Sequence, residues 1–351
     1  MSDSLDRPLV VRRPALRWLL PVLVLVVVVG VGTAGRILTA DAAPSLPPRT
    51  AAQLLVDLQT SEPIGLSGTV VQKSDLGLPN LSTSGSQGSS DFTSMLSGSH
   101  TLRVWYDGQQ RQRVALLGSL GESDVIRNGL DVWSWSSKKN TATHTKIEVG
   151  SKVPAVPTPT TPQEAAAEAL AKISPTTTVS TDGTGHVAGR PAYELVLVPK
   201  DKASRIGQVR IAIDSAKKVP LRVRVYARSA STPAFEVGFT QISFTQPDAA
   251  QFTFTPPPGV KMTERKADRD SEHPTGQTPT VVGSGWTSVL ILRSTAVGKS
   301  AQLLGSLPRV SGSWGSGRLI ESGVVCALIT DDGRVIAGAV DPARLYQVAA
   351  R

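Results

Sequence analysis

The chain has 351 residues, of which 40% are hydrophobic and 19% charged, so it is long enough for about two domains and too apolar to be mostly disordered. Its net charge of +9 comes from dispersed Lys and Arg residues with few aromatic residues among them, which argues against a nucleic-acid partner; a nearby anionic surface is the simpler interpretation. The single cysteine, Cys326, excludes an internal disulfide and any Cys-rich metal cluster.

The N-terminal residues predict a segment directed to a membrane. Residues 1–17 form a basic tail that contains Arg7, Arg12, Arg13 and Arg17, and residues 18–35 contain no charged side chain. As a helix that rises 1.5 Å per residue, the uncharged stretch would span about 27 Å, enough for the hydrocarbon core of a bilayer. The preceding arginines then place the N-terminus in the cytoplasm.

Residues 36–48 form a spacer that leaves the fate of this segment open. Ala40-Asp41-Ala42 matches the A-x-A pattern of a signal-peptide cleavage site, whereas the uncharged stretch is longer than an ordinary signal sequence. Residues 18–35 are therefore either a retained transmembrane anchor or a signal peptide cleaved near Ala42. In the first case we expect the rest of the chain on the extracytoplasmic face of the cytoplasmic membrane, and in the second we expect it to be secreted.

Residues 49–262 predict a β-rich domain that begins with a short amphipathic helix. Thr50 and Gln53 form a capping-box pattern ahead of an apolar stripe that includes Leu54 and Leu58. After a strand expected over Leu66–Lys73, the serine-rich stretch 80–99 is typical of a mobile loop. An alternative is a flap that touches a ligand or a membrane through Phe92, Met95 and Leu96.

The sequence then predicts a meander of four short strands between His100 and Trp135. Their turns are expected at Asp107-Gly108 and Asn128-Gly129, because these dipeptides favour tight hairpin turns. A Pro/Thr-rich connector over 153–161 follows. A second amphipathic helix is expected to begin at Thr161-Pro162 and to reach Ile173.

Three later strands alternate strictly between apolar and polar residues, which predicts an antiparallel sheet with one covered face and one wet face. The apolar phase shifts after Phe239, which indicates a bulge near Thr240. The apolar positions are Val209, Ile211, Ile213, Leu221, Val223, Val225, Phe235, Val237 and Phe239.

Only two short helices are available to cover this wide sheet, so we expect an apolar cavity between sheet and helices. Such a cavity suits acyl chains, because each buried methylene contributes about 0.8 kcal/mol. The alternative is that the same face is simply the core of the domain. The candidate lining consists of the nine positions above together with Leu54, Leu58, Trp105 and Trp133, although the two tryptophans could equally be part of the sheet core.

The strand sequences also resemble a known family. The stretches Arg103–Gly108, Val125–Trp135, Tyr193–Lys200 and Phe252–Pro256 are similar in order and kind to the strands of the LolA-like family, and the likeness covers residues 49–262. The family includes lipoprotein carriers and RseB/MucB-like regulators of sigma-E. The resemblance implies a mainly β (α+β) fold, an open antiparallel β half-barrel with a helical lid, that binds lipid or lipoprotein acyl chains without catalysis.

Two features depart from a free carrier domain and favour an RseB-like sensor instead. One is the possible membrane anchor, and the other is the extra sequence after residue 262. For such a sensor, the resemblance implies a membrane-spanning anti-sigma factor as partner. Carrier and sensor both remain open on the sequence alone.

The remaining residues predict a linker over 263–280 and a small C-terminal α+β module over 281–351. The module is expected to contain a strand over Gly285–Leu292, a helix over Lys299–Ser306, and a hairpin of Val324–Thr330 with Arg334–Val340. Because so short a stretch makes a small core, we expect the module to dock on the preceding sheet. Cys326 falls in the middle of a strand, which indicates a buried, inert thiol.

No pattern of catalytic or metal-binding residues appears in the sequence. The four histidines are not spaced as metal ligands, and Gly298-Lys299-Ser300 lacks the first glycine of a phosphate-binding loop. We therefore expect a non-enzymatic binding protein without a metal or cofactor. Its expected partners are lipid or lipoprotein acyl chains and the cytoplasmic membrane, with an anti-sigma factor as a further possibility.

Overall fold

The computed structural model describes residues 44–60, 65–77, 92–108, 110–119, 121–147, 175–266, 280–293 and 307–351. The predictions for residues 1–43, for the helix over 161–173, for the helix over 299–306 and for Gly298-Lys299-Ser300 lie outside these ranges. Among the described residues, no helix has the length and apolar character needed to cross a membrane.

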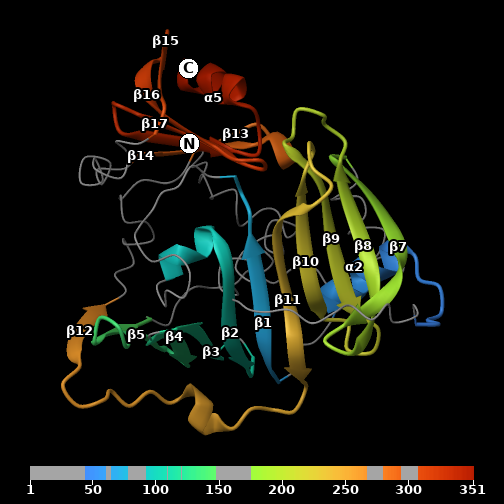
Figure 1. Ribbon diagram of the computed structural model, residues 1–351, viewed down its shortest axis with the longest axis vertical. Helices are drawn as coiled ribbons and strands as arrows, with labels where there is room; N and C mark the ends of the chain where they lie inside the picture. Colours follow the sequence, from blue (N-terminus) through green and yellow to red (C-terminus); the bar gives the residue numbers. More distant parts are fainter. Residues whose placement is uncertain are drawn as a thin grey trace, which may run out of the picture.

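The larger of the two described sheets has twelve strands in the order β12-β6-β5-β4-β3-β2-β1-β11-β10-β9-β8-β7. The two edge strands, β12 and β7, do not pair with each other, so the sheet is open, and the predicted mainly β, half-barrel fold is confirmed (Figure 1). The strands are β1 (Leu66–Ser74), β2 (Gly98–Tyr106), β3 (Arg111–Gly118), β4 (Gly121–Asn128), β5 (Asp131–Ser136), β6 (Thr141–Lys146), β7 (Thr177–Val187), β8 (Arg190–Pro199), β9 (Ile206–Asp214), β10 (Pro220–Ala227), β11 (Pro233–Ser243) and β12 (Lys261–Lys266).

The local signals in the sequence explain the turns and the bulge. Gly129 has φ 63° and is the first of the two residues between the paired Asn128 and Asp131. Leu130 lacks a positive φ, which fits a type II′ turn, where only the first central residue needs it. Thr69 pairs with Gln241 and Val70 with Phe239, so Thr240 is the extra residue of the predicted bulge.

The described residues of this part of the chain include three helical segments, which are α2 (Ala51–Thr60) and the short 3₁₀ helices η2 (Phe92–Leu96) and η3 (Ala249–Phe252). The capping box before α2 is confirmed, because the Thr50 amide donates to Gln53 Oε1 at 2.9 Å and the Gln53 amide to Thr50 Oγ1 at 3.2 Å. Of the stretch 80–99, which was expected to be a mobile loop, residues 92–99 are described, and they include the short helix η2.

Three strands of the large sheet were not expected from the sequence. β6 and β7 carry mostly polar residues, and β12 falls partly in the predicted linker over 263–280, so its inclusion in the sheet corrects that prediction. β12 pairs parallel with β6, from Lys261 with Thr141 to Lys266 with Lys146. β7 and β12 are the edge strands, and β6 lies next to β12. Strands at the margin of a sheet can be held by backbone hydrogen bonds without apolar alternation, which explains why the pattern missed them.

The C-terminal residues form a second, six-stranded sheet with the order β13-β14-β18-β17-β16-β15. Its elements are β13 (Thr280–Val282), η4 (Gly285–Thr287), β14 (Val289–Arg293), β15 (Arg309–Gly312), β16 (Gly315–Glu321), β17 (Cys326–Thr330), β18 (Arg334–Gly338) and α5 (Pro342–Ala349). The predicted hairpin is confirmed as β17 and β18, whereas the strand expected over Gly285–Leu292 begins only after η4. Helix α5, which the sequence analysis missed, packs Leu345 and Val348 against a separate core around Leu328.

The two sheets contact each other through the connection between β8 and β9. Ser204 forms an isolated antiparallel bridge with Val340, and the Arg205 guanidinium lies 3.0 Å from Glu321 and 2.7 Å from Asp341. Figure 1 shows the smaller sheet, in red, across one end of the strands of the larger one. Backbone pairing and charge pairing therefore hold the smaller sheet on the larger.

Cys326 lies in the core of the smaller sheet, as predicted. Its side chain is fully buried, and burial raises the pKa of its thiol. Both observations agree with an unreactive core residue.

Candidate functional site: the inner face of the large sheet

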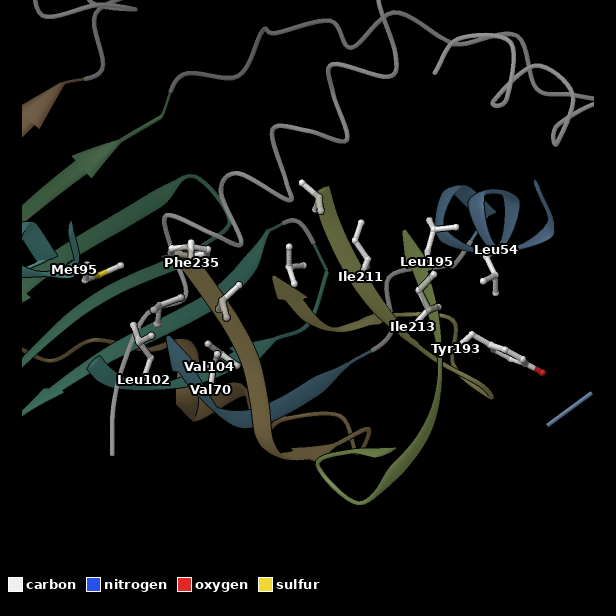
Figure 2. Close-up of a cluster of buried hydrophobic side chains, with 14 of the residues drawn as sticks. Leu54, Val70, Met95, Leu102, Val104, Tyr193, Leu195, Ile211, Ile213 and Phe235 are labelled. Carbon is white, nitrogen blue, oxygen red and sulfur yellow. The ribbon is translucent and has the colours of Figure 1, made fainter. Parts of the chain in front are cut away.

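One side of the twelve-stranded sheet, here called the inner face, is the side that α2 and η2 cover. Alternate residues of each strand point to it, because side chains alternate along a strand. Figure 2 shows this inner-face cluster, to which α2, η2 and strands from both halves of the sheet contribute. Its buried members are Leu54, Leu55, Val70, Met95, Leu102, Val104, Val114, Leu116, Tyr193, Leu195, Val209, Ile211, Ile213, Val223, Phe235 and Val237.

Helix α2 lies over the β7–β8 end of the inner face. Leu54 is fully buried in the cluster, and Figure 2 shows it beside Leu195. The residues before the helix are tied to the same strands, since the Tyr193 hydroxyl donates to Pro47 O and the Thr184 hydroxyl to Pro44 O, each at 2.8 Å. These bonds fix the entry of the chain into α2 and hold the helix on the sheet.

Over the β1–β2 part of the inner face lies η2. It buries Met95 in the cluster, and Gln72 of β1 donates from Nε2 to the Met95 carbonyl at 2.9 Å. The His100 Nε2 lies 2.6 Å from Ser94 O and 2.7 Å from Ser97 O. Buried polar side chains therefore anchor η2 on an otherwise apolar surface.

One row of register partners on the inner face keeps contact with solvent, and we call it the access row. It runs across β7 to β11 and consists of Val179, Leu197, Val209, Val225 and Phe235. Val209 and Phe235 are 7% and 8% exposed, and the other three are partly exposed. In the next row, Leu195, Ile211, Val223 and Val237 are 0%, 5%, 1% and 1% exposed. Solvent thus reaches the cluster from the side of the access row.

The inner face changes from apolar to hydroxyl-bearing residues at β4 and β5. In one cross-strand row, Leu102 and Leu116 are followed by Ser123, Ser136 and Thr141; in the neighbouring row, Val104, Val114 and Val125 are followed by Ser134 and Thr143. The face is therefore mostly apolar from β7 to β3, and hydroxyl groups begin at Ser123 of β4 in one row and at Ser134 of β5 in the other.

A pocket of about 180 Å³ lies on the hydroxyl-rich part of this face. Phe92 of η2, which also packs against the inner-face cluster, forms one side of it. The other lining residues are Ser123, Ser134, Trp135, Ser136, Lys139, Thr141 and Thr143. The pocket thus lies next to the apolar cluster on the same side of the sheet.

Most of the candidate lining residues meet on the inner face. Seven of them belong to the buried cluster, and three more pack against it. The seven are Leu54, Val209, Ile211, Ile213, Val223, Phe235 and Val237, and the three are Leu58, Val225 and Phe239. Leu221 instead packs with Val187, Ala192 and Ala212, because it is the extra residue of a bulge between Pro220 and Arg222.

The two candidate tryptophans lie on the outer face, which corrects their expected position. Trp105 follows the inward-facing Val104, and its ring lies 5.3 Å and 5.1 Å from the guanidinium carbons of Arg103 and Arg113. Trp133 stacks on His144 at 4.2 Å. Both belong to one row of register partners on the side opposite the cluster.

The sequence did not reveal that the outer face of β3–β6 is also covered. Phe254 lies 5.1 Å from Trp133 and 6.0 Å from Trp135, measured between ring centroids, and Phe252 is 1% exposed. The segment around η3 therefore covers this face, and the tryptophans belong to a second apolar layer rather than to the inner-face cluster.

His144, on the outer face, is held between two carboxylates. Its Nε2 lies 2.8 Å from Asp131 Oδ1, and its Nδ1 lies 2.8 Å from Glu264 Oε2. Burial alone lowers the pKa of the imidazole, but the hydrogen bonds and charges of Asp131 and Glu264 outweigh burial and raise it. Among the described residues, no group of three His, Cys, Asp or Glu side chains is placed to hold a metal ion.

Comparison with known proteins gives a family match for the central part of the chain. Residues 92–258 match the family model of the MucB/RseB N-terminal domain. No curated protein matches the sequence.

Three solved structures illustrate the likeness at the level of the backbone. A chain of the complex of Pseudomonas aeruginosa MucA/MucB is 16% identical, with a TM-score of 0.46, and the match covers 85% of this chain and 96% of that one. An uncharacterised conserved protein from Thermus thermophilus is 14% identical, with a TM-score of 0.36 and coverages of 61% and 99%. A LolA superfamily protein from Nitrosomonas europaea is 11% identical, with a TM-score of 0.23 and coverages of 59% and 99%.

A likeness at these scores carries no conclusion about a site or a partner. The match of residues 92–258 to the MucB/RseB N-terminal domain confirms the resemblance that the strand sequences indicate, and the open, mainly β sheet agrees with it.

Proposed function

We propose that this protein is an extracytoplasmic, non-enzymatic binding protein that holds lipid or lipoprotein acyl chains on its inner face, as a carrier or chaperone. The access row carries the proposal, because five apolar side chains on five neighbouring strands stay partly or slightly exposed at the margin of a buried apolar cluster. The MucB/RseB family match supports an extracytoplasmic binding or regulatory role rather than catalysis.

The dimensions of the access row suit an extended acyl chain. Five adjacent strands separated by about 4.8 Å give a row about 19 Å long. Burial of an acyl chain along it gains about 0.8 kcal/mol for each methylene taken out of water. The neighbouring, buried row supplies an apolar floor for such a chain.

Two adjacent residues of β8 allow a matched test of the proposal. Leu197 lies in the access row, and Val198 points to the opposite face; both are partly exposed. In Leu197→Glu a carboxylate enters the apolar row, so the purified full-length chain should bind a fluorescent fatty-acyl probe at least tenfold more weakly. Val198→Glu should bind it as the unchanged protein does. Equal binding by the two variants, or no probe binding by the unchanged protein, contradicts the proposal.

A second candidate function is an RseB-like sensor that regulates a membrane-spanning anti-sigma factor. The contact between the two sheets favours it, since Val324 of the smaller sheet packs with Ala227 and Ala234, and Val225 of the access row packs against the same cluster. A chain bound in the access row would therefore touch residues that also contact the smaller sheet.

Crosslinking of the full-length protein in its native membranes separates the two functions. Recovery of an anti-sigma factor or another signalling protein supports the sensor. Recovery of lipoproteins or lipid alone supports the carrier.

A further inference from the structure

Across the inner face the residues change from apolar to hydroxyl-bearing, so one end of the face is apolar and the other is polar. The same cross-strand rows that carry Leu102 and Leu116 continue without interruption to Ser136 and Thr141. A molecule that lies along these rows therefore meets hydrocarbon at one end and hydroxyl groups at the other. A purely apolar ligand would leave the second end unused.

The pocket on the hydroxyl-rich part is equipped to bind a polar group. Five hydroxyl-bearing residues line it, and none of their hydroxyls is hydrogen-bonded to another protein group within the ranges described above. Ser123 is only 4% exposed and lines the pocket, and its hydroxyl has no protein partner among the described residues, so it can bond to a polar group placed in the pocket. Trp135 also lines the pocket, and its Nε1 is a buried donor without a partner in the described part of the chain, which costs free energy.

The charge of the lining residues indicates the charge of the group that the pocket would bind. Lys139 is the only ionisable residue among the described residues that line the pocket, and no carboxylate lines it. An ammonium group can only donate hydrogen bonds, and serine and threonine hydroxyls can donate them as well, so the lining favours a group rich in acceptor oxygens. A phosphate or a carboxylate is such a group, and its negative charge is opposite to that of Lys139.

The size and position of the pocket fit the head of an amphiphile. Its volume of about 180 Å³ is far above the roughly 10–15 Å³ that one water molecule requires. Phe92 both lines the pocket and packs against the apolar cluster. A polar head placed here has its tail directed towards the inner-face cluster.

We propose that the pocket over β4–β6 binds the anionic head, a phosphate or carboxylate, of an acyl lipid whose tail lies on the inner-face cluster. This inference rests on the proposed function, because the tail occupies the same apolar face. It adds that the ligand lies across the strands and that Lys139 and the surrounding hydroxyls select its head group.

Probes that share one tail and differ in the head test the inference on the full-length protein. Lysophosphatidic acid and monoacylglycerol with the same acyl chain differ only in the phosphate, and glycerol phosphate has the head without the tail. We expect lysophosphatidic acid to bind about tenfold more tightly than monoacylglycerol, and glycerol phosphate to bind far more weakly than either.

Neighbouring residues supply matched variants for the same measurement. Lys139→Gln and Thr143→Val should each remove most of the preference for lysophosphatidic acid and leave monoacylglycerol binding unchanged. Lys138→Gln, in the same turn, and Thr145→Val, further along β6, do not line the pocket and should keep the preference.

The outcomes separate this inference from the proposed function. Equal binding of the two lipids, or a preference that survives both Lys139→Gln and Thr143→Val, overturns the head-group site while acyl binding stands. Glycerol phosphate that binds as tightly as lysophosphatidic acid overturns the role of the tail. Failure of both lipids to bind overturns the proposed function itself.

Discussion

His144 of β6 and Glu264 of β12 are register partners in the one parallel strand pair described, and Nδ1 of the histidine lies 2.8 Å from Oε2 of the glutamate. The other ring nitrogen faces Asp131 at the same distance. A neutral imidazole has one N–H and can donate to only one carboxylate, whereas the protonated ring donates to both. The protonation state of His144 therefore bears on how firmly β12 is attached to the sheet.

The first prediction concerns the pH dependence of this attachment. The pKa of His144 is raised in the folded protein, so its contribution to the free energy of unfolding is complete below the unfolded pKa of about 6.5 and is lost as the pH rises through the folded pKa. Replacement by Gln should lower the urea midpoint at pH 5.5 and have little effect at pH 9. An equal decrease of the urea midpoint at pH 5.5 and at pH 9 would show that protonation of His144 does not stabilise the attachment of β12.

The second prediction concerns the buried ion pair of Asp214 with Arg190. Asp214 is fully buried; burial alone raises the pKa of its carboxyl, but the Arg190 guanidinium and the backbone amides of Lys217 and Ala216 outweigh burial and lower it. Asp214→Asn should reduce the free energy of unfolding at pH 7 by about 3 kcal/mol, because Arg190 loses its charged partner.

The sign of the pH dependence gives a further check on Asp214. A lowered folded pKa stabilises the protein above the unfolded pKa of about 3.9, and that stability is lost as the pH falls through the folded value. The difference between the unchanged protein and the Asn variant in urea unfolding should therefore shrink on acidification. Asp182→Asn, at an aspartate whose side chain is 57% exposed, serves as control and should change stability by less than about 1 kcal/mol. A similar decrease in the free energy of unfolding for Asp214→Asn and Asp182→Asn would contradict a stabilising role of the buried Asp214–Arg190 pair.

The third prediction concerns the close approach of β1 and β11 at Gly68. A Cβ at this position would meet the carbonyl oxygen of Gln241 and lie 2.9 Å from the Phe239 ring. Gly68→Ala should therefore destabilise the sheet by about 1–3 kcal/mol and weaken acyl-probe binding. Gly185→Ala is the control, since nothing lies within 4 Å of a Cβ there. Thermal unfolding that ranks the two variants in the opposite order would rule out this packing.

The fourth prediction concerns the contact between the two sheets. Arg205 pairs with Glu321 and Asp341 of the smaller sheet, and its side chain is only 20% exposed. Arg205→Met should leave both carboxylates without this partner and make the smaller sheet more sensitive to limited proteolysis. Arg309→Met, whose partner Asp331 lies within the smaller sheet and whose side chain is 68% exposed, should not. Equal cleavage of the two variants would show that Arg205 does not hold the sheets together.

The strands with strict alternation were predictable because their pattern reflects one buried face. Val209, Ile211 and Ile213 lie in the inner-face cluster, and the bulge at Thr240 follows from a single shift of phase. The polar strands β6 and β12 carry no such pattern, because backbone pairing and polar contacts such as that of His144 with Glu264 hold them in the sheet.

The faces of Trp105 and Trp133 could not be fixed from local pattern. Alternation shows that Trp105 and Val104 point in opposite directions, but it does not show which of the two side chains faces the cluster. Phe254, which covers the outer face at Trp133, is distant in the sequence. The hydroxyl pocket was hidden for a similar reason. Its residues lie on three strands whose serines and threonines look like ordinary solvent-facing positions until the register brings them together.

Photoaffinity mapping on the full-length protein tests acyl binding at the inner face most directly. A fatty acid with a photoreactive group near its terminal methyl would be bound, irradiated and located by peptide mass spectrometry. The proposed function predicts labels on access-row residues such as Leu197, Val209 and Val225, and their loss on competition with unlabelled fatty acid. Labels confined to outward-facing residues such as Val198, or labels that do not compete, would contradict it.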